Sequence, residues 1–175
     1  MTIYTRAGDG GTTALFGGKR IFKSDLQVET YGSIDELSSI LGIILSLSDK
    51  KTNDSLISSI QKDLYLIMSF LADGKVELSV LNNKVGTFED QIDKISLGLS
   101  KLNGFILPQG NLATTTCHFA RTVCRRSERT VVLYAKNSSL LKNPNILLII
   151  RYLNRLSDLL FTLARQSSHK HEVVV

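Results

Sequence analysis

The sequence has no tryptophan, only two cysteines and no long apolar run. Its longest purely aliphatic stretch, residues 146–150, is far shorter than the roughly 18 residues that a membrane-spanning helix needs. The N-terminal residues also lack the apolar core of a secretory signal. We therefore expect a cytoplasmic protein without a membrane segment.

Neither sign of charge dominates the chain. Lys plus Arg outnumber Asp plus Glu by 21 to 16, which gives a net charge of +5. This excess favours an anionic ligand, but it does not require nucleic acid. A nucleic-acid surface would also need exposed aromatics among its basic residues, and Tyr and Phe are spread thinly here. No Glu is followed three residues later by His, which excludes the usual ferritin-like di-metal centre.

The two cysteines, Cys117 and Cys124, lie seven positions apart in a segment with helical periodicity. Their Cα atoms would be ~10.5 Å apart in a helix, whereas a disulfide requires a separation below ~7 Å. No Cys-x-x-Cys pair or second Cys/His cluster indicates a metal site. We expect both thiols to be free and buried.

The length of 175 residues and an apolar content of 43% predict a single domain with its own core. Apolar residues recur at helical spacing, and strand signals are nearly absent. The sequence therefore predicts an all-α fold, an antiparallel bundle of about five helices. The first expected helix begins at residue 33. The other four are expected over residues 53–72, 87–102, 112–135 and 143–166.

Capping residues indicate where these helices begin and end. Ser33 and Glu36 form a capping box, and Asn111 is a candidate cap for the fourth helix. The fifth opens with Asn143 followed by a proline at its first position. Asn103-Gly104 is a C-terminal signal for the third helix. Within the single domain 1–175 we expect an ordered arm over 1–30, the bundle over 31–167 and a tail over 168–175. Fraying is expected from Ser167 onward.

The arm is rich in glycine and has no helical periodicity, which predicts a loop or a short hairpin. Its successive small residues allow backbone N–H groups to converge on an anion, while nearby basic side chains and hydroxyls supply further contacts. It matches neither a P-loop nor a dinucleotide-binding fingerprint. A plain surface loop is the alternative.

The fourth expected helix concentrates arginines on one face, with Arg121, Arg125 and Arg129 at helical spacing. Stacked guanidiniums repel one another unless an anion lies between them, and a triphosphate suits this need because Arg pairs with phosphate oxygens bidentately. A solvated basic face is the alternative. Because apolar residues show that the helix packs inside the bundle, we favour a cleft or an interface.

Other polar positions have two interpretations each. Asp35 either benefits from a helix N-terminus or reaches an arginine. Phe105 is either a core aromatic or a functional one in an extended apolar segment, and His118 is best explained as a core histidine. In the fifth helix, Arg155 either pairs with Asp158 within the helix or joins a polar stripe with a ligand-binding Asn154.

Together these segments resemble the PduO-type ATP:cob(I)alamin (corrinoid) adenosyltransferases. The resemblance spans nearly the whole chain, in order. Its motifs are the arm from Tyr4 to Thr13, Lys23-Ser-Asp25, Val28-Glu-x-Tyr-Gly-x-x-Asp-Glu-Leu37, Phe105-Ile-Leu-Pro-x-Gly110, His118-x-Ala-Arg-Thr-Val-Cys-Arg-Arg-x-Glu-Arg129 and Tyr152-Leu-Asn-Arg-Leu-Ser-Asp-Leu-Leu-Phe161.

The resemblance implies transfer of the 5′-deoxyadenosyl group of ATP to Co(I) of a corrinoid, with release of triphosphate. It implies a homotrimer with the site between subunits. On the corrinoid side of the site, Phe105 would lie beneath the ring, and Asp35 would pair with Arg121 of a neighbouring subunit. The catalytic residues would be Asp35, Phe105, Arg121 and Arg125. ATP would be bound by Thr5, Arg6, Ala7, Gly8, Asp9, Gly11, Thr12, Thr13, Lys23, Arg125, Arg126, Ser127, Glu128, Arg129 and Asn154.

The resemblance also implies Mg²⁺ bound through the ATP phosphates, cob(I)alamin as substrate, a flavoprotein reductase and an adenosylcobalamin-dependent enzyme as partners. A nucleophile supplied by the cofactor explains why the chain needs no Ser-His-Asp or paired-carboxylate machinery. The alternative from another class is an ATP-binding regulatory bundle without transferase chemistry.

Overall fold

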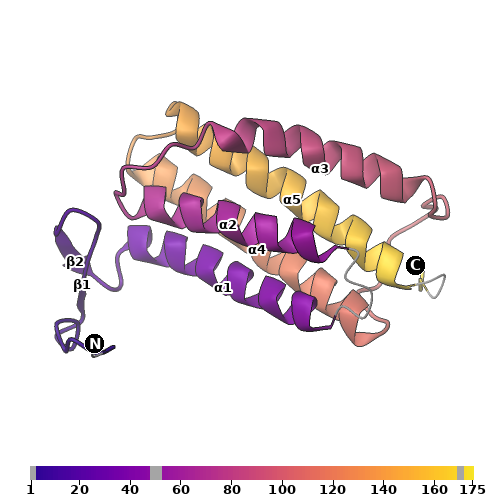
Figure 1. The fold of residues 1–175 in the computed structure, drawn as a ribbon, viewed down its shortest axis with the longest axis horizontal. Coiled ribbons are helices and arrows are strands. Elements are labelled where there is room, and N and C mark those ends of the chain that lie inside the picture. The colour runs from indigo at the N-terminus through magenta and orange to yellow at the C-terminus, as the bar shows by residue number, and fades with distance from the viewer. Residues whose placement is uncertain (1–2, 48–52, 169–171) are drawn as a thin grey trace.

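The computed structural model describes residues 3–47, 53–168 and 172–175. In the described residues, five helices lie side by side and a small hairpin projects from one end of the bundle (Figure 1). The predicted helical bundle is confirmed, and the arm forms a short hairpin, one of the two forms expected for it. The elements are β1 (Thr12–Ala14), β2 (Arg20–Phe22), α1 (Leu26–Ser46), α2 (Asp54–Leu71), α3 (Val80–Ser96), α4 (Leu112–Asn137) and α5 (Pro144–Ser168).

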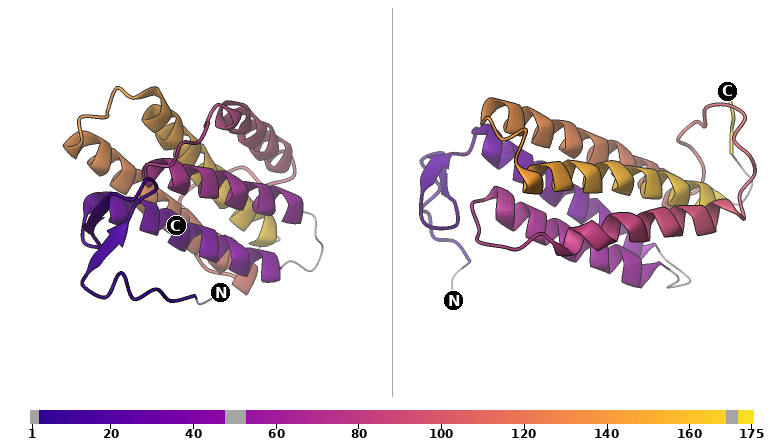
Figure 2. Two further views of the ribbon diagram at one scale, coloured as in Figure 1. Left: turned by 60° about the vertical axis from the view of Figure 1, so that its left-hand side comes forward. Right: turned by 90° about the horizontal axis from the view of Figure 1, so that it is seen from above.

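Helix α4 is the centre of the packing, because it contacts both α1 and α5. Helix α2 packs on the other side of α1, and α3 packs on α5 (Figure 2). The buried core is made of aliphatic side chains from all five helices. None of the helices in the described part of the chain is long and apolar enough to span a bilayer.

A buried polar cluster joins three of the helices. The Tyr152 hydroxyl of α5 donates to the Asp63 carboxylate of α2 at 3.0 Å. The Lys84 ammonium of α3 lies 3.7 Å from the same carboxylate and donates to Ser59 at 2.6 Å. Burial raises the pKa of Asp63, which the lysine charge partly opposes. The paired groups fix α5 relative to α2 and α3.

Several sequence predictions are confirmed. The Asn111 side chain accepts from the Thr114 amide at 2.8 Å and caps α4. The Asn143 side chain accepts from the first amides of α5, which begins at Pro144. Cys117 and Cys124 are free and buried. Burial raises the pKa of Cys117 to about 11, so this thiol is inert at neutral pH.

The prediction of a capping box at Ser33 was wrong. Helix α1 begins at Leu26, where the Asp25 side chain accepts from the Gln27 amide at 2.9 Å. Ser33 lies inside the helix, is buried, and donates to the Thr30 carbonyl. The Ser33 carbonyl accepts from Ser127 of α4, so this small residue lies at the interface between α1 and α4 and not at a helix end. Leu26–Thr30 therefore belongs to the helical part of the chain and not to the arm.

The third helix was placed too late in the chain. Helix α3 spans Val80–Ser96, whereas residues 87–102 were expected. Asn103-Gly104 does not end it, because this pair lies in the segment between α3 and α4. Glycine is required at position 104 for another reason, because a Cβ atom there would lie 2.6 Å from the Val175 carbonyl oxygen.

The expectation of a frayed tail was wrong for its described part. Ser167 and Ser168 are helical, and Val173 and Val175 make three backbone hydrogen bonds to Phe105 and Leu107 at 2.9–3.2 Å. The tail residues between Ser168 and Glu172 lie outside the described residues. Apolar β-branched side chains pair readily with an extended partner, and the segment 105–107 offers one.

The start of α1 can be tested by removing its cap. We expect Asp25→Ala to lower the free energy of unfolding by about 1 kcal/mol, because a capping oxygen is lost. Ser24→Ala, a change at the preceding exposed residue, is the matched control and should have little effect. Denaturant unfolding followed by circular dichroism measures both. Equal effects of the two substitutions would contradict the assignment of the cap.

Candidate functional site

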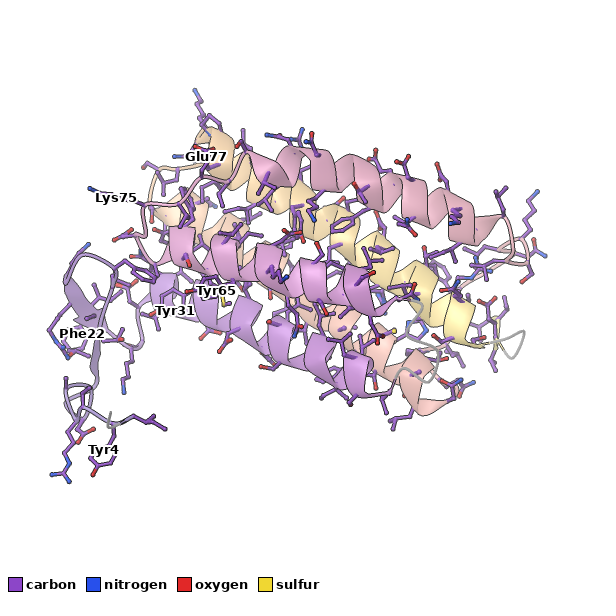
Figure 3. All side chains as sticks on the ribbon, in the orientation of Figure 1. Tyr4, Phe22, Tyr31, Tyr65, Lys75 and Glu77 are labelled. Carbon is purple, nitrogen blue, oxygen red and sulfur yellow. The ribbon has the colours of Figure 1, made fainter. Side chains whose placement is uncertain are left out.

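The arm is anchored to the bundle at the closed end of its hairpin. β1 and β2 pair antiparallel, with Thr13 opposite Ile21. The Phe16 amide donates to the Ala72 carbonyl at the end of α2, and Leu15 is buried. Gln27 of α1 donates to the Leu71 carbonyl at 2.7 Å. The remainder of the arm, including Tyr4, extends away from the helices (Figure 3).

Arg20 organises the turn that precedes β1. Its guanidinium donates to the Ala7 carbonyl and to the Thr12 hydroxyl, the latter at 2.6 Å. Arg6 adopts a positive φ of 57°, and its guanidinium lies 5.5 Å from the centre of the Tyr4 ring. The turn is therefore held in one shape by a side chain from the opposite strand.

Most of the expected ATP-binding residues of the arm share this turn. Gly8 lies so close to Lys23 that a Cβ atom would be 3.2 Å from its ammonium nitrogen. The Lys23 amide donates to the Gly11 carbonyl at 2.9 Å. The structure thus brings a lysine to a glycine-rich turn that is open to solvent. The residues of this group that are exposed or half-buried are Thr5, Arg6, Ala7, Gly8, Asp9, Gly11, Thr12, Thr13 and Lys23.

The arginines on the exposed face of α4 differ in whether an acidic side chain pairs with them. Arg126 forms an ion pair with Glu36 of α1. Arg125 and Arg129 are exposed, and neither guanidinium takes part in the hydrogen bonds or ion pairs found between described residues. Ser127 differs from its neighbours, because it is fully buried and its hydroxyl donates to the Ser33 carbonyl. Its side chain joins α4 to α1 and does not face solvent.

Arg121 is the most constrained of these arginines. Its Nε atom is buried and has no hydrogen-bond partner among the described residues. Burial and the neighbouring Arg125 charge lower the pKa of Arg121. Both causes disfavour an isolated cation, so a negatively charged group beside this side chain would stabilise it.

The polar stripe of α5 is divided between two sets of partners. Asn154 donates to Glu128 of α4 at 3.3 Å, which places this amide at the edge of the arginine face. Arg155 pairs with Asp158 at 2.9 Å, which is one of the two interpretations of this stripe, and also with Glu89 of α3. Asn154 therefore belongs with the α4 residues, whereas Arg155 ties α5 to α3.

Phe105 is 85% exposed, so the interpretation as a core aromatic was wrong. It belongs to the segment between α3 and α4. Figure 1 shows this segment at the end of the bundle opposite the hairpin. Asp25, which ends the arm, lies near Tyr134 close to the other end of α4. The 26 residues of α4 span ~39 Å. One chain therefore cannot bring the arm and Phe105 to the same reacting atom.

His118 is a core residue, as expected. It is 3% exposed, and its ring packs 6.1 Å from that of Phe161, measured between centroids. Burial and the Arg121 charge lower its pKa, which the Glu172 charge partly opposes. The imidazole is therefore neutral at pH 7 and has no route to solvent as a base.

Residues 3–167 match the family model described as cobalamin adenosyltransferase. The chain belongs to the cobalamin adenosyltransferase family. It is 39% identical to the corrinoid adenosyltransferase of Citrobacter freundii over 93% of both chains. It is 35% identical to the PduO corrinoid adenosyltransferase of Salmonella typhimurium over 98% of its own length, and it spans 52% of that relative.

The fold agrees with a solved structure of the same family. A variant of the PduO-type ATP:corrinoid adenosyltransferase from Lactobacillus reuteri, complexed with cobalamin and ATP, superposes with a TM-score of 0.86. The two are 29% identical, and the match covers 99% of this chain and 96% of the other. The protein is thus a corrinoid adenosyltransferase, which transfers the adenosyl group of ATP to corrinoid cobalt. The interpretation as a regulator without chemistry is excluded.

Sequence reasoning missed Arg20. A lone arginine in a glycine-rich segment indicates no partner. The antiparallel pairing of β1 with β2 is the missing information, since it sets Arg20 beside the turn.

We expect Arg20→Ala to raise the KM for ATP about tenfold while changing kcat less. The reason is that the turn loses hydrogen bonds to Ala7 and Thr12 that typically contribute ~1 kcal/mol each. Steady-state kinetics with ATP varied measures the effect. Lys19→Ala removes the same charge at the adjacent exposed residue and should stay near wild type. An equal rise in both variants would show that only charge matters.

Proposed function

We propose that adenosyl transfer takes place at a site built from two neighbouring chains of a homotrimer. The observation that carries this proposal is the position of the arm and Phe105 at opposite ends of one bundle. A head-to-tail arrangement of subunits places one end of a chain beside the other end of its neighbour, and a ring of such contacts closes. Each site then receives its arm and its α4 face from different chains.

ATP binds between the arm of one chain and α4 of the next. The exposed turn supplies backbone amides and the Lys23 ammonium, and Asn154 with Glu128 recognises polar groups of the nucleoside. Arg125, Arg126 and Arg129 bind the triphosphate. Ser127 contributes through its place in the backbone of α4, because its side chain is buried.

The reaction is a displacement at the 5′-carbon of ATP. The electron pair of Co(I) forms the Co–C bond, the C–O bond breaks, and its electron pair leaves with triphosphate. The chain's role is to stabilise the negative charge that develops on the leaving group. Preorganised guanidiniums do this at little reorganisation cost, and Arg125 has no competing partner among the described residues.

The corrinoid lies at the other side of the site. Phe105 is exposed and aromatic, so it can occupy the space below the corrin ring and displace the lower axial ligand. Asp35 is exposed on α1, and we propose that it pairs with Arg121 of the neighbouring chain. That pairing would supply a negative charge to Arg121, whose Nε atom has no partner among the described residues of its own chain.

Mg²⁺ would enter with ATP. The described residues contain no group of three or more His, Cys, Asp or Glu side chains that could hold a metal ion. Phosphate oxygens and water satisfy the octahedral preference of Mg²⁺ without a protein cage. Co(I) must be supplied by an electron donor, so we propose a flavoprotein reductase as one partner and an adenosylcobalamin-dependent enzyme as the recipient of the product.

The role of Arg125 is tested by Arg125→Lys, which keeps the charge but loses the bidentate fork. We expect kcat to fall roughly 10²–10³-fold, the usual loss for one preorganised donor. The assay follows the absorption spectrum of reduced cobalamin with ATP under anaerobic conditions, with each substrate varied in turn.

Asp35→Asn is the comparison variant on the corrinoid side. It should raise the KM for the corrinoid more than the KM for ATP, because Asp35 lies away from the triphosphate in the proposed site. A near-normal kcat for Arg125→Lys with only a raised ATP KM would contradict this role. It would show that Arg125 binds the substrate and the transition state equally.

A further inference from the structure

The segment that carries Phe105 is held by the other end of the chain. The Phe105 amide donates to the Val175 carbonyl at 3.2 Å, and the Val175 amide donates back to the Phe105 carbonyl at 2.9 Å. The Leu107 amide donates to the Val173 carbonyl at 2.9 Å. Ile106 and Val174 form an antiparallel bridge. We name residues 172–175 the strap.

The strap is fixed to the bundle by a buried ion pair. Arg165 of α5 is 8% exposed, and its guanidinium donates to both carboxylate oxygens of Glu172, at 2.7 and 3.1 Å. The same guanidinium donates to the Ser100 carbonyl at 2.7 Å. One arginine therefore joins α5, the strap and the segment before Phe105. A bidentate pair in this setting gives a defined position as well as affinity.

Gly104 makes room for the strap. A Cβ atom at this position would lie 2.6 Å from the Val175 carbonyl oxygen and 2.8 Å from a Val174 methyl carbon. The backbone of Gly104 does not have a positive φ, so conformational freedom does not explain the residue. The close approach of the strap does.

We propose that the strap holds the Phe105 segment in its working position, and that Glu172 is a positioning residue for the corrinoid side of the site. The proposal rests on the function proposed for Phe105 above. The Phe105 side chain is exposed and has few contacts of its own, so its position depends on its backbone. That backbone is bonded to Val175 on both its amide and its carbonyl.

The test uses two glycine variants of the same loop. Gly104→Ala forces the strap away, whereas Gly98→Ala adds a Cβ atom only 3.6 Å from the Ile95 carbonyl oxygen, an ordinary contact. Hydrogen exchange at the Phe105 and Leu107 amides reports the strap directly. We expect exchange about tenfold faster in Gly104→Ala, because the hydrogen bonds that protect these amides open, and wild-type exchange in Gly98→Ala.

The catalytic readout compares cobalamin with cobinamide, a corrinoid that has no lower axial base to displace. We expect Gly104→Ala to lower kcat/KM for cobalamin about tenfold, the factor associated with one to two net hydrogen bonds, with cobinamide and the ATP KM within about twofold of wild type. Glu172→Gln should act in the same direction without any steric clash. Faster exchange with an unchanged ratio of the two corrinoids would overturn the proposal, as would unchanged exchange.

Phe105→Ala separates failure of this inference from failure of the proposed function. If Phe105→Ala lowers turnover of cobalamin selectively and the strap variants do not, the strap has no positioning role. If Phe105→Ala itself leaves the ratio of the two corrinoids unchanged, the role proposed for Phe105 is wrong, and the positioning role of the strap falls with it.

Discussion

The position of α4 between α1 and α5 is the constraint from which the site follows. Two sides of this helix are buried by small and apolar residues, and Ser127 joins it to α1 through a backbone carbonyl. Its arginines can occupy only the remaining face. There Arg126 is neutralised by Glu36, but Arg121 meets burial and a like charge together. The bundle thus presents a concentration of positive charge that an anionic substrate would relieve.

The same packing separates the parts of the site along the bundle. The arm is anchored where α1 begins and α2 ends, whereas Phe105 precedes α4 and is bonded to the strap. Each end is fixed by its own hydrogen bonds, those of Arg20 in the arm and those of Arg165 beside the strap. A movement within one chain that brought the two ends together would break these bonds. A site shared between chains brings the two ends together without breaking either set of contacts.

The sequence was sufficient for the helical fold and for the caps of α4 and α5. These features depend on local spacing and on single residues such as Asn111 and Asn143. It failed where a residue's role depends on a distant segment. The pattern around Ser33 predicts a helix start, but Ser33 lies within α1 and packs against α4. The pattern at Gly104 predicts a helix end, but the residue instead makes room for Val175.

The central claim is that each active site takes its arm and its α4 face from different chains. Its most direct test mixes two inactive variants, one with the arm damaged by Lys23→Ala together with Arg20→Ala, the other with Arg125→Ala. After dissociation and reassembly, three quarters of random trimers are mixed and each has one intact site, so about a quarter of wild-type activity should return. Mixed assemblies that stay inactive would contradict the account, because a site within one chain cannot be restored by a neighbour.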